Sequence, residues 1–253
     1  MELPAYTIRP CASLSEFSAC LQMQREVWQF ADLDITPLRS FVITKNSGGF
    51  TLGAFSVADE KLLGFAHALA AFDEQNQPYY YSHMLAVDPA FQNSGLGLKL
   101  KFAQRDYALQ RGIGLMVWTF DPLQSRNAHL NINKLGGVIR RYQVDYYGNY
   151  SSSTLHRGLE TDRLLVEWWL DSACVKSIAE SNIQPEISSP VTRVAIPFDL
   201  EKLKTRNMEE AHTWQLQVRQ SFQAHLKNDL FCAGFERGTD DKPSQYLFFS
   251  DSK

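Results

Sequence analysis

The chain has 253 residues, of which 44% are hydrophobic and 12% aromatic, so it can bury the core of one large domain or two small ones. Its net charge of −3 and its pI of about 6.1 give no indication of a nucleic-acid or membrane-surface partner. The N-terminus lacks a secretory pattern, and no run approaches the roughly 18 apolar residues of a membrane span. We therefore expect a cytoplasmic protein with neither nucleic acid nor membrane as a partner.

The cysteines and histidines do not form a metal-binding pattern. The four cysteines contain no C-x-x-C pair, and the six histidines contain no H-x-x-x-H pair. Free buried thiols in a reducing compartment are the expectation, with disulfides as the alternative, and no metal site is predicted.

Apolar periodicity predicts the elements of the first half of the chain. Ser13 and Glu16 have the spacing of a capping box, so a helix is expected from Ser13 or Ser15 to about Phe30. The other expected elements are a strand at 6–9, a short helix or turn at 37–44, and strands at 50–57, 62–72 and 79–87.

The second half is expected to alternate between helices and strands in the same way. The predicted elements are a helix from about 97 to 111, a strand at 115–120, a helix ending at 135, one or two strands within 138–150, a strand at 164–170, a strand at 191–196, a helix from about 199, a longer helix to about 226, and strands at 230–236 and 245–249.

These elements suggest three segments. Residues 1–170 form the main domain, residues 171–190 form a linker containing Ser and Pro, and residues 191–253 form a C-terminal α+β extension packed on the first domain. The tail repeats the order of residues 6–72, namely a strand, two helices and a hairpin. It is therefore either a degenerate copy of the N-terminal half of the fold or an unrelated extension.

The stretch from Tyr79 to Arg111 carries the clearest chemical pattern. It predicts a buried strand, a turn containing Gly95 and Gly97, and a helix. A helix N-terminus presents unpaired N–H groups and a partial positive charge, and glycine lets a phosphate approach them closely. The turn is a candidate pyrophosphate cradle, and a plain turn is the alternative.

This stretch resembles the central motif of the GNAT superfamily of acyl-CoA acyltransferases. The matching residues are Val87-Asp88-Pro89 and Gln92-x-x-Gly95-x-Gly97. The runs SHMLAVDP, WTFDP, RNAHLN and DRLLVEWWL further resemble a poorly characterised bacterial group of predicted acetyltransferases within that superfamily. The resemblance implies an α+β (α/β) fold with a mixed, mostly antiparallel central sheet flanked by helices.

The resemblance also implies a site for acetyl-CoA or another acyl-CoA. The loop would bind the pyrophosphate, the end of the central strand would polarise the thioester carbonyl, and an Asn near the start of the helix after the 121–127 loop would touch the pantetheine. The residues carried over for these contacts are Leu85, Ala86, Val87, Gln92, Asn93, Ser94, Gly95, Leu96, Gly97 and Asn127. Asn127 is also expected to cap that helix, with Ser125 as the alternative cap.

The catalytic residues depart from the family pattern. No carboxylate precedes the Val-x-Pro bend, and His83 is the candidate general base in its place, with a packed histidine as the alternative. The usual Tyr before a Lys-x-Gly ending is Ile132 here. Tyr147 is the candidate acid, from a group of four tyrosines for which strand packing is the alternative role: Tyr142, Tyr146, Tyr147 and Tyr150.

The implied function is direct transfer of an acetyl group from acetyl-CoA to an amine of a small molecule or a peptide. The alternative is a non-catalytic acyl-CoA sensor or partner-binding module on the same fold. A dinucleotide-binding site is excluded because the third glycine of G-x-G-x-x-G is missing after Gly97. The acceptor and the acyl chain length are not specified by the sequence, and a monomer or homodimer is expected.

Overall fold

The computed structural model describes residues 2–29, 32–148, 158–181, 183 and 189–250. These residues divide into two compact units, one ending at Val117 and the other beginning at Trp118. The boundary falls inside strand β5 (Leu115–Phe120), and each unit contains strands covered by helices.

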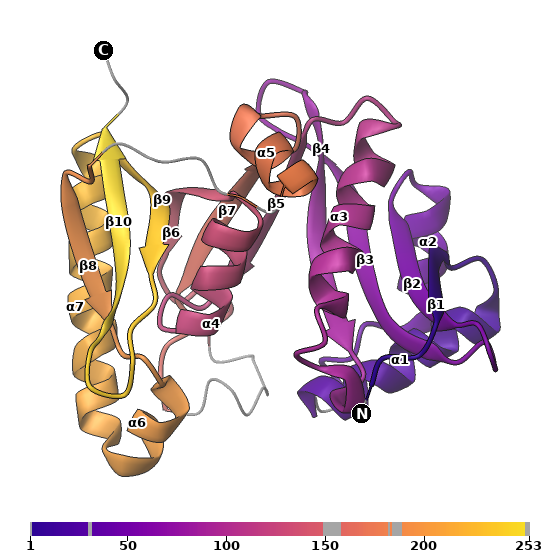
Figure 1. Cartoon of the computed structure of the whole chain (residues 1–253), viewed down its shortest axis with the longest axis horizontal. Helices are drawn as coiled ribbons and strands as arrows, with labels where there is room; N and C mark the ends of the chain where they lie inside the picture. The colour runs from indigo at the N-terminus through magenta and orange to yellow at the C-terminus, as the bar shows by residue number, and fades with distance from the viewer. Residues whose placement is uncertain (1, 30–31, 149–157, 182, 184–188, 251–253) are drawn as a thin grey trace. The chain divides into compact units, whose positions relative to one another are not determined.

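The first unit is built around strands β1 to β4 and the start of β5. They lie in the order β1-β2-β3-β4-β5, and neighbours are antiparallel except for the parallel pair of β4 and β5. Besides the start of β5, the elements of this unit are β1 (Tyr6–Pro10), α1 (Leu14–Trp28), α2 (Leu38–Asn46), β2 (Phe50–Ser56), β3 (Leu62–Phe72), β4 (Pro78–Val87), the 3-10 helix η1 (Pro89–Phe91) and α3 (Leu96–Leu109). Figure 1 labels these strands and α-helices.

Helices cover both faces of this sheet, and the strand sequences reflect that. Phe55 and Phe65 pack with α1 and α2 on one face, whereas Ala54 and Ala66 pack with α3 on the other. Small residues on the α3 side let that helix approach closely, and every residue of β2 is buried.

Helix α1 begins with the predicted capping box. Ser13 is the N-cap, and its hydroxyl accepts the Glu16 N–H while the Glu16 carboxylate accepts the N–H groups of Ser13 (2.9 Å) and Ala12 (2.7 Å). Burial alone would raise the pKa of Glu16, but these hydrogen bonds and the guanidinium of Arg9 at 2.5 Å lower it to about 2.

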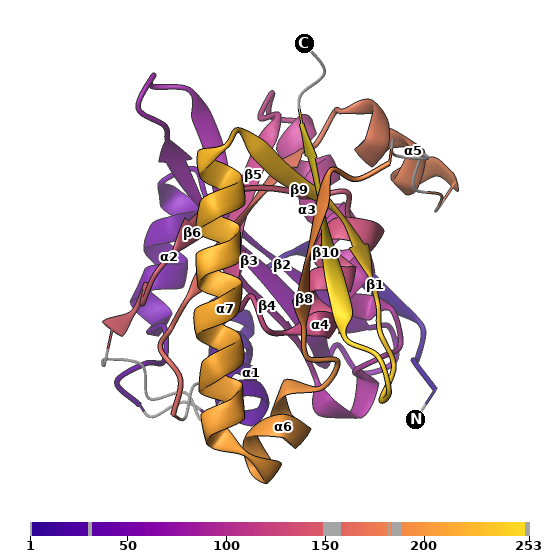
Figure 2. The same ribbon diagram turned by 90° about the vertical axis from the view of Figure 1, so that its left-hand side faces the viewer.

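The second unit contains the remaining elements. Strands β7-β6-β9-β10-β8 lie in that order with antiparallel pairing, and α7 lies across β6, β8 and β9 (Figure 2). Its elements are α4 (Ser125–Ala128), the π-helix η2 (His129–Lys134), β6 (Val138–Gln143), β7 (Arg163–Trp169), α5 (Ala173–Ser181), β8 (Thr192–Ile196), α6 (Leu200–Arg206), α7 (Met208–Lys227), β9 (Leu230–Glu236) and β10 (Ser244–Ser250).

Aromatic rings fill the core beneath α7. Phe222 is fully buried, with its ring centroid 5.0 Å from that of Tyr246 and 4.9 Å from that of Phe248. Val218 and Ala211 extend the same buried face of the helix, so apolar contacts help to hold α7 against the strands.

Two details differ from the expectations. The strand expected within residues 138–150 ends at Gln143, and residues 144–148 form a turn. The segment expected to be a linker contains α5, whose Val175 and Ile178 are buried beside Gly136. The boundaries proposed at residues 170 and 190 stay a prediction.

The proposed repeat is not confirmed by the strand pairing. The tail has the expected order of elements, but β8 pairs with β10, the second strand of the hairpin. In the first unit, β1 pairs with β2, the first strand after the two helices. The two segments therefore share an order of elements and differ in topology.

Among the described helices, none combines the length and the hydropathy that a membrane crossing requires.

The capping box of α1 should give the stability of the chain a distinct pH dependence. Because the folded pKa of Glu16 is lowered, its contribution is complete above the unfolded value of 4.5 and is lost as pH falls toward about 2. Glu16→Gln should lower the free energy of unfolding by about 1–2 kcal/mol at pH 7, as measured by urea denaturation.

The difference between Glu16→Gln and the wild type should shrink below pH 4.5. Glu26→Gln, an exposed change on the same helix, serves as the control and should have little effect at any pH. A Glu16→Gln difference that stays constant from pH 7 to pH 3 would contradict this explanation.

Candidate functional site

The loop between β4 and α3 leaves the N-terminus of the helix open. Gly95 is the N-cap residue with φ of 85°, a left-handed conformation that favours glycine, and Asn93 is left-handed as well. A Cβ built on Gly95 meets no atom within 4 Å, and this N-cap has no side chain to bond the helix amides. The space beside Gly95 is therefore open to an anion, and the nearby Leu96 N–H donates to the Ser94 hydroxyl at 3.4 Å.

The loop is attached to the strand at both of its ends. The Gln92 side chain donates to the Val87 carbonyl oxygen at 3.4 Å, and the Asp88 carboxylate accepts the Ala90 N–H at 2.9 Å. Lys61 Nζ lies 3.1 Å from the same carboxylate. A Cβ on Gly97 would make only ordinary contacts with side chains of β4, so α3 begins directly beside that strand.

The end of β4 is paired on one side only within the first unit. Its register with β3 runs along the whole strand, but its described register with β5 covers Tyr80 and Tyr81 alone. Leu85 and Val87 pack on the α3 side, while Ala86 faces α1 and α2. The β4 edge from 82 to 87 that faces away from β3 can therefore offer N–H groups to a ligand carbonyl.

His83 is the extra residue of a β-bulge in β4. Met84 pairs with His67 and Ser82 pairs with Ala68, so His83 has no partner on β3. Bulges commonly re-aim a side chain beside an active site. His83 is exposed as a residue, yet protein atoms crowd its imidazole, and this burial lowers the pKa of His83. The ring is therefore neutral at pH 7 and can accept a proton.

A second histidine that the sequence did not single out lies beside His83. The His67 ring is fully buried, with its centroid 6.0 Å from that of His83. Its Nδ1 lies 2.8 Å from the Thr51 hydroxyl, its Nε2 lies 3.4 Å from the Thr44 hydroxyl, and the Phe41 ring is 4.6 Å away. Burial, with a smaller effect from His83, lowers the pKa of His67 to about 3.

A buried polar cluster lies on the α3 side of β4. Lys101 Nζ donates to the Ser82 hydroxyl at 3.0 Å, and that hydroxyl donates to Gln104 Oε1 at 3.0 Å. Burial lowers the pKa of Lys101 well below its usual value. Within the described part of the chain, Gln104 Nε2 has no hydrogen-bond partner. A basic residue on an otherwise apolar stripe was the sequence sign of this cluster.

Asn127 belongs to the second unit and does not cap a helix as expected. Helix α4 begins after Gln124, which makes no side-chain cap, and Asn127 lies exposed within the helix. Ser125, the rival cap, instead lies 2.8 Å from the Ser244 hydroxyl. The contact of Asn127 with a pantetheine stays a prediction.

The other two asparagines of this region make tertiary contacts from the π-helix. Asn131 Oδ1 accepts the Trp118 indole N–H at 3.2 Å, and Asn133 Nδ2 donates to the Phe235 carbonyl at 2.7 Å. These bonds explain why poor helix formers occur here. Ile132, at the position of the missing Tyr, is fully buried and has no proton to donate.

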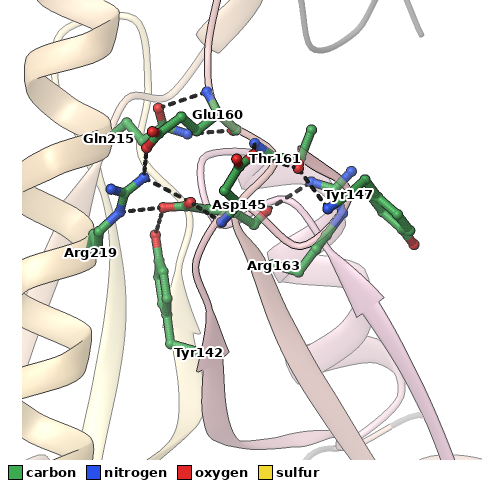
Figure 3. A network of polar contacts seen from close by, with 9 residues as sticks. Tyr142, Asp145, Tyr147, Glu160, Thr161, Arg163, Gln215 and Arg219 are labelled. Carbon is green, nitrogen blue, oxygen red and sulfur yellow. Dashed lines mark hydrogen bonds and ion pairs between the residues drawn. The ribbon is translucent and has the colours of Figure 1, made fainter. Parts of the chain in front are cut away.

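The tyrosines of the second unit separate into two groups. The Tyr142 hydroxyl donates to Asp162 at 2.5 Å, and burial together with this bond raises the pKa of Tyr142, so its proton is firmly held. Tyr146 and Tyr147 lie on the exposed turn after β6, and Tyr147 is drawn in Figure 3. Tyr150 lies outside the described residues. Tyr147 is thus accessible, and its role as an acid stays a prediction.

No cluster of three or more His, Cys, Asp or Glu side chains is placed to hold a metal ion in the described ranges. All four cysteines are free, and three of them are buried.

Comparison with known proteins relates part of the chain to a known family. Residues 15–132 match the family described as the acetyltransferase (GNAT) family. No curated protein matches the sequence significantly.

Solved structures share the fold at low sequence identity. The ribosomal-protein-S18-alanine N-acetyltransferase of Escherichia coli is 16% identical with a TM-score of 0.52, and the alignment covers 67% of this chain and 96% of that one. YncA of Salmonella typhimurium, solved with acetyl-CoA, is 17% identical with a TM-score of 0.53, covering 66% and 95%.

A NatC complex structure with bound Gag peptide and CoA also matches. The matched chain is 16% identical with a TM-score of 0.50, and the alignment covers 66% of this chain and 98% of that one. At these identities the similarity establishes the fold.

The buried His67 should make the stability depend on pH between its two pKa values. The unfolded chain binds a proton below about pH 6.5, whereas folded His67 does so only near pH 3. The unfolded state therefore holds more protons in that window, and stability should fall as pH falls, by up to about 4 kcal/mol across it.

His67→Gln should remove most of this slope in denaturation curves recorded from pH 7 to pH 4. The matched control is His212→Gln, an exposed change on α7 that should keep the slope of the wild type. If both variants show the same slope as the wild type, the buried histidine is not its source.

Proposed function

We propose that this chain, whose residues 15–132 form a GNAT acetyltransferase domain, transfers an acetyl group from acetyl-CoA to an amine of a small molecule or a peptide. The observation that carries the proposal is the open N-terminus of α3, with left-handed Gly95 directly after β4. YncA of Salmonella typhimurium, which has the same fold, was solved with acetyl-CoA.

The residues of the loop fit a bound pyrophosphate. The N–H groups of Gly95 and Gly97 would hold it, because the space that a side chain on Gly95 would fill is open. The Ser94 N–H already donates to the Phe91 carbonyl, and the Leu96 N–H donates to the Ser94 hydroxyl. The charge of Lys61 is directed to Asp88 rather than to the loop, so backbone amides and the helix dipole supply the attraction. Asn127 is proposed to contact the pantetheine.

Acetyl-CoA would supply a thioester whose carbonyl carbon is open to attack by an amine. The N–H groups of Leu85 and Val87 would face the carbonyl oxygen, where negative charge develops. They point away from β3, because the Asp88 N–H donates to Leu63 on β3 and successive N–H groups of a strand alternate between its two sides. Preorganised donors of this kind need no rearrangement during the reaction.

His83 is proposed to accept the proton of the acceptor amine. The bulge places His83 and Met84 toward the α1 and α2 face, and the lowered pKa keeps the imidazole neutral at pH 7. In the family, those two helices cover the acceptor side. Tyr147 is proposed as the proton donor for the leaving thiolate, because Ile132 cannot serve and Tyr142 is bonded to Asp162.

The acceptor class rests on the known relatives. The E. coli relative is named for acetylating an alanine of a ribosomal protein, and the NatC structure holds a peptide. A peptide or small-molecule amine is therefore the proposed acceptor. A cytoplasmic location and a monomeric or homodimeric state remain predictions.

A non-catalytic acyl-CoA-binding role is the second candidate. The buried Ile132 at the usual acid position and the absence of a carboxylate on β4 favour it. The two functions differ in one observable, since only the enzyme releases CoA thiol in the presence of an amine.

Acetyl-CoA at 100 times its Kd should stabilise the wild type by about 2.7 kcal/mol, which corresponds to roughly 5 to 10 °C in a thermal scan. Gly95→Glu should abolish this shift, because a carboxylate would occupy the open space before the helix. The scan is run with and without ligand for each protein.

Gly112→Glu is a matched control for the Gly95 variant. Gly112 follows the other end of α3, has a φ of 73°, and has the same open surroundings, so the backbone strain of the substitution is similar. This variant should keep the full acetyl-CoA shift. Equal shifts in both variants would rule out the loop as the binding site.

His83→Gln should lower kcat by a factor on the order of 10² or more, because a glutamine cannot accept the proton. Its Kd for acetyl-CoA should stay within about twofold of the wild type, since the loop is unchanged. Thiol release with an amine panel measures the first quantity and calorimetry the second. Wild-type turnover in this variant would refute the base role.

A further inference from the structure

Helix α7 of the C-terminal tail contacts the loops around Tyr147 through a network of charged side chains (Figure 3). Arg219 lies on this helix, and its Nε and Nη2 donate to the two carboxylate oxygens of Asp162 at 2.9 and 2.8 Å. The same guanidinium pairs with Glu160. This two-pronged geometry is specific to arginine and fixes the direction of the carboxylate.

Asp162 is 1% exposed, so its charge needs complete compensation. Besides the two bonds from Arg219, it accepts the Tyr142 hydroxyl at 2.5 Å and the Asp145 N–H at 3.0 Å. Burial alone would lower the pKa of Arg219, but its bonds to Asp162 and Glu160 raise it, and the guanidinium stays charged. The buried pair is therefore saturated with hydrogen bonds.

The bond to Asp162 holds Asp145 in an unusual backbone conformation. Asp145 has a φ of 44°, which is rare and costly for a residue with a side chain. Its carboxylate accepts both the N–H of Thr161, at 3.1 Å, and the Thr161 hydroxyl, at 3.0 Å. The turn that contains Asp145 is thus bonded directly to the loop that contains Thr161.

Thr161 then fixes the backbone of both exposed tyrosines. Its carbonyl oxygen accepts the Tyr146 N–H at 3.0 Å, and its hydroxyl oxygen accepts the Tyr147 N–H at 2.8 Å. Gln215 lies one turn before Arg219, and its side chain makes two hydrogen bonds to the backbone of Glu160. It accepts the Glu160 N–H at 3.2 Å and donates to the Glu160 carbonyl at 2.7 Å. A continuous chain of bonds thus runs from α7 to the turn.

The turn that the network holds is exposed to solvent. Tyr146 and Tyr147 are each 44% exposed, with ring centroids 4.8 Å apart, and the Arg163 guanidinium lies 5.0 Å from the Tyr147 ring centroid. Phe222 and its neighbours already attach α7 to the strands. The polar network is therefore additional to what packing the helix requires, and its effect is a fixed orientation of the turn.

We infer that Arg219 and Gln215 are positioning residues, through which the C-terminal tail holds Tyr147 in place to protonate the leaving thiolate of the proposed transfer. This inference rests on the proposed function, in which Tyr147 is the proton donor. It assigns a role to the tail, and it predicts that damage to the network lowers kcat and leaves coenzyme binding unchanged.

The test compares Arg219→Lys with Arg206→Lys. Lysine keeps the positive charge beside Asp162, so the chain can still fold, but it cannot make the two parallel hydrogen bonds of the guanidinium. Arg206 is a matched control, because it makes an exposed ion pair with Glu210 at 3.0 Å on the neighbouring helix α6. Hydrogen exchange of the Tyr146 and Tyr147 amides is measured, along with kcat in a thiol-release assay and the Kd for acetyl-CoA.

Arg219→Lys should speed exchange of the two tyrosine amides by about tenfold or more, because their acceptors on Thr161 are no longer held. Its kcat should fall by at least about fivefold while the Kd for acetyl-CoA changes by less than about twofold. Arg206→Lys should match the wild type in all three quantities. Gln215→Met removes only the two hydrogen bonds to the Glu160 backbone, and it should show the same changes as Arg219→Lys. It replaces Arg219→Lys if that variant does not fold.

Wild-type amide exchange in Arg219→Lys and Gln215→Met would overturn the inference. So would faster exchange with an unchanged kcat, because the network would then be structural only. Failure of the wild type to bind acetyl-CoA is a separate result: it would overturn the proposed function and, with it, the role assigned to Tyr147, while the exchange data would still report on the network.

Discussion

Strand β4 is the element on which both the core and the candidate site depend. Its pairing with β3 runs from Pro78 to Val87 with one bulge at His83, whereas its described pairing with β5 covers only Tyr80 and Tyr81. One edge is thus held rigidly while the other edge retains hydrogen-bonding groups that a ligand can use. The same strand ends at Val87, immediately before the loop that opens the N-terminus of α3. A donor edge and an anion-binding turn are therefore consecutive in the chain.

The β-bulge adds a third property to this strand. Because His83 is an extra residue, both His83 and Met84 lie toward the α1 and α2 face, and the alternation resumes with Leu85 toward α3. The buried His67 beneath His83 is bonded to Thr51 and Thr44 and stays neutral. The position of His83, the proposed proton acceptor, thus depends on the buried polar groups of His67, Thr51 and Thr44.

Local features could be predicted from the sequence, and non-local ones could not. The capping box at Ser13 and the glycine turn at Gly95 depend on residues close in sequence, and the structure has both. The bulge at His83 depends on the register with β3, and the buried state of Lys101 depends on Ser82 and Gln104 across the sheet. No spacing along the chain encodes these contacts.

The second unit was harder to predict for the same reason. Asn127 was expected to cap a helix, but a helix start is decided by where the preceding chain turns, and α4 begins after Gln124. The fixed turn around Tyr147 rests on Arg219, which lies 72 residues further along the chain. The tail was recognisable as α+β, whereas its pairing order, with β8 beside β10, was decided by tertiary packing.

The central claim is that acetyl-CoA binds at the loop between β4 and α3. Labelling only the glycines with ¹⁵N gives 14 amide signals, among which Gly95 and Gly97 can be assigned by substitution. On titration with acetyl-CoA, the account predicts large shifts of these two signals and little change at Gly112, at the far end of the same helix. Saturating acetyl-CoA that leaves Gly95 and Gly97 unmoved would contradict it.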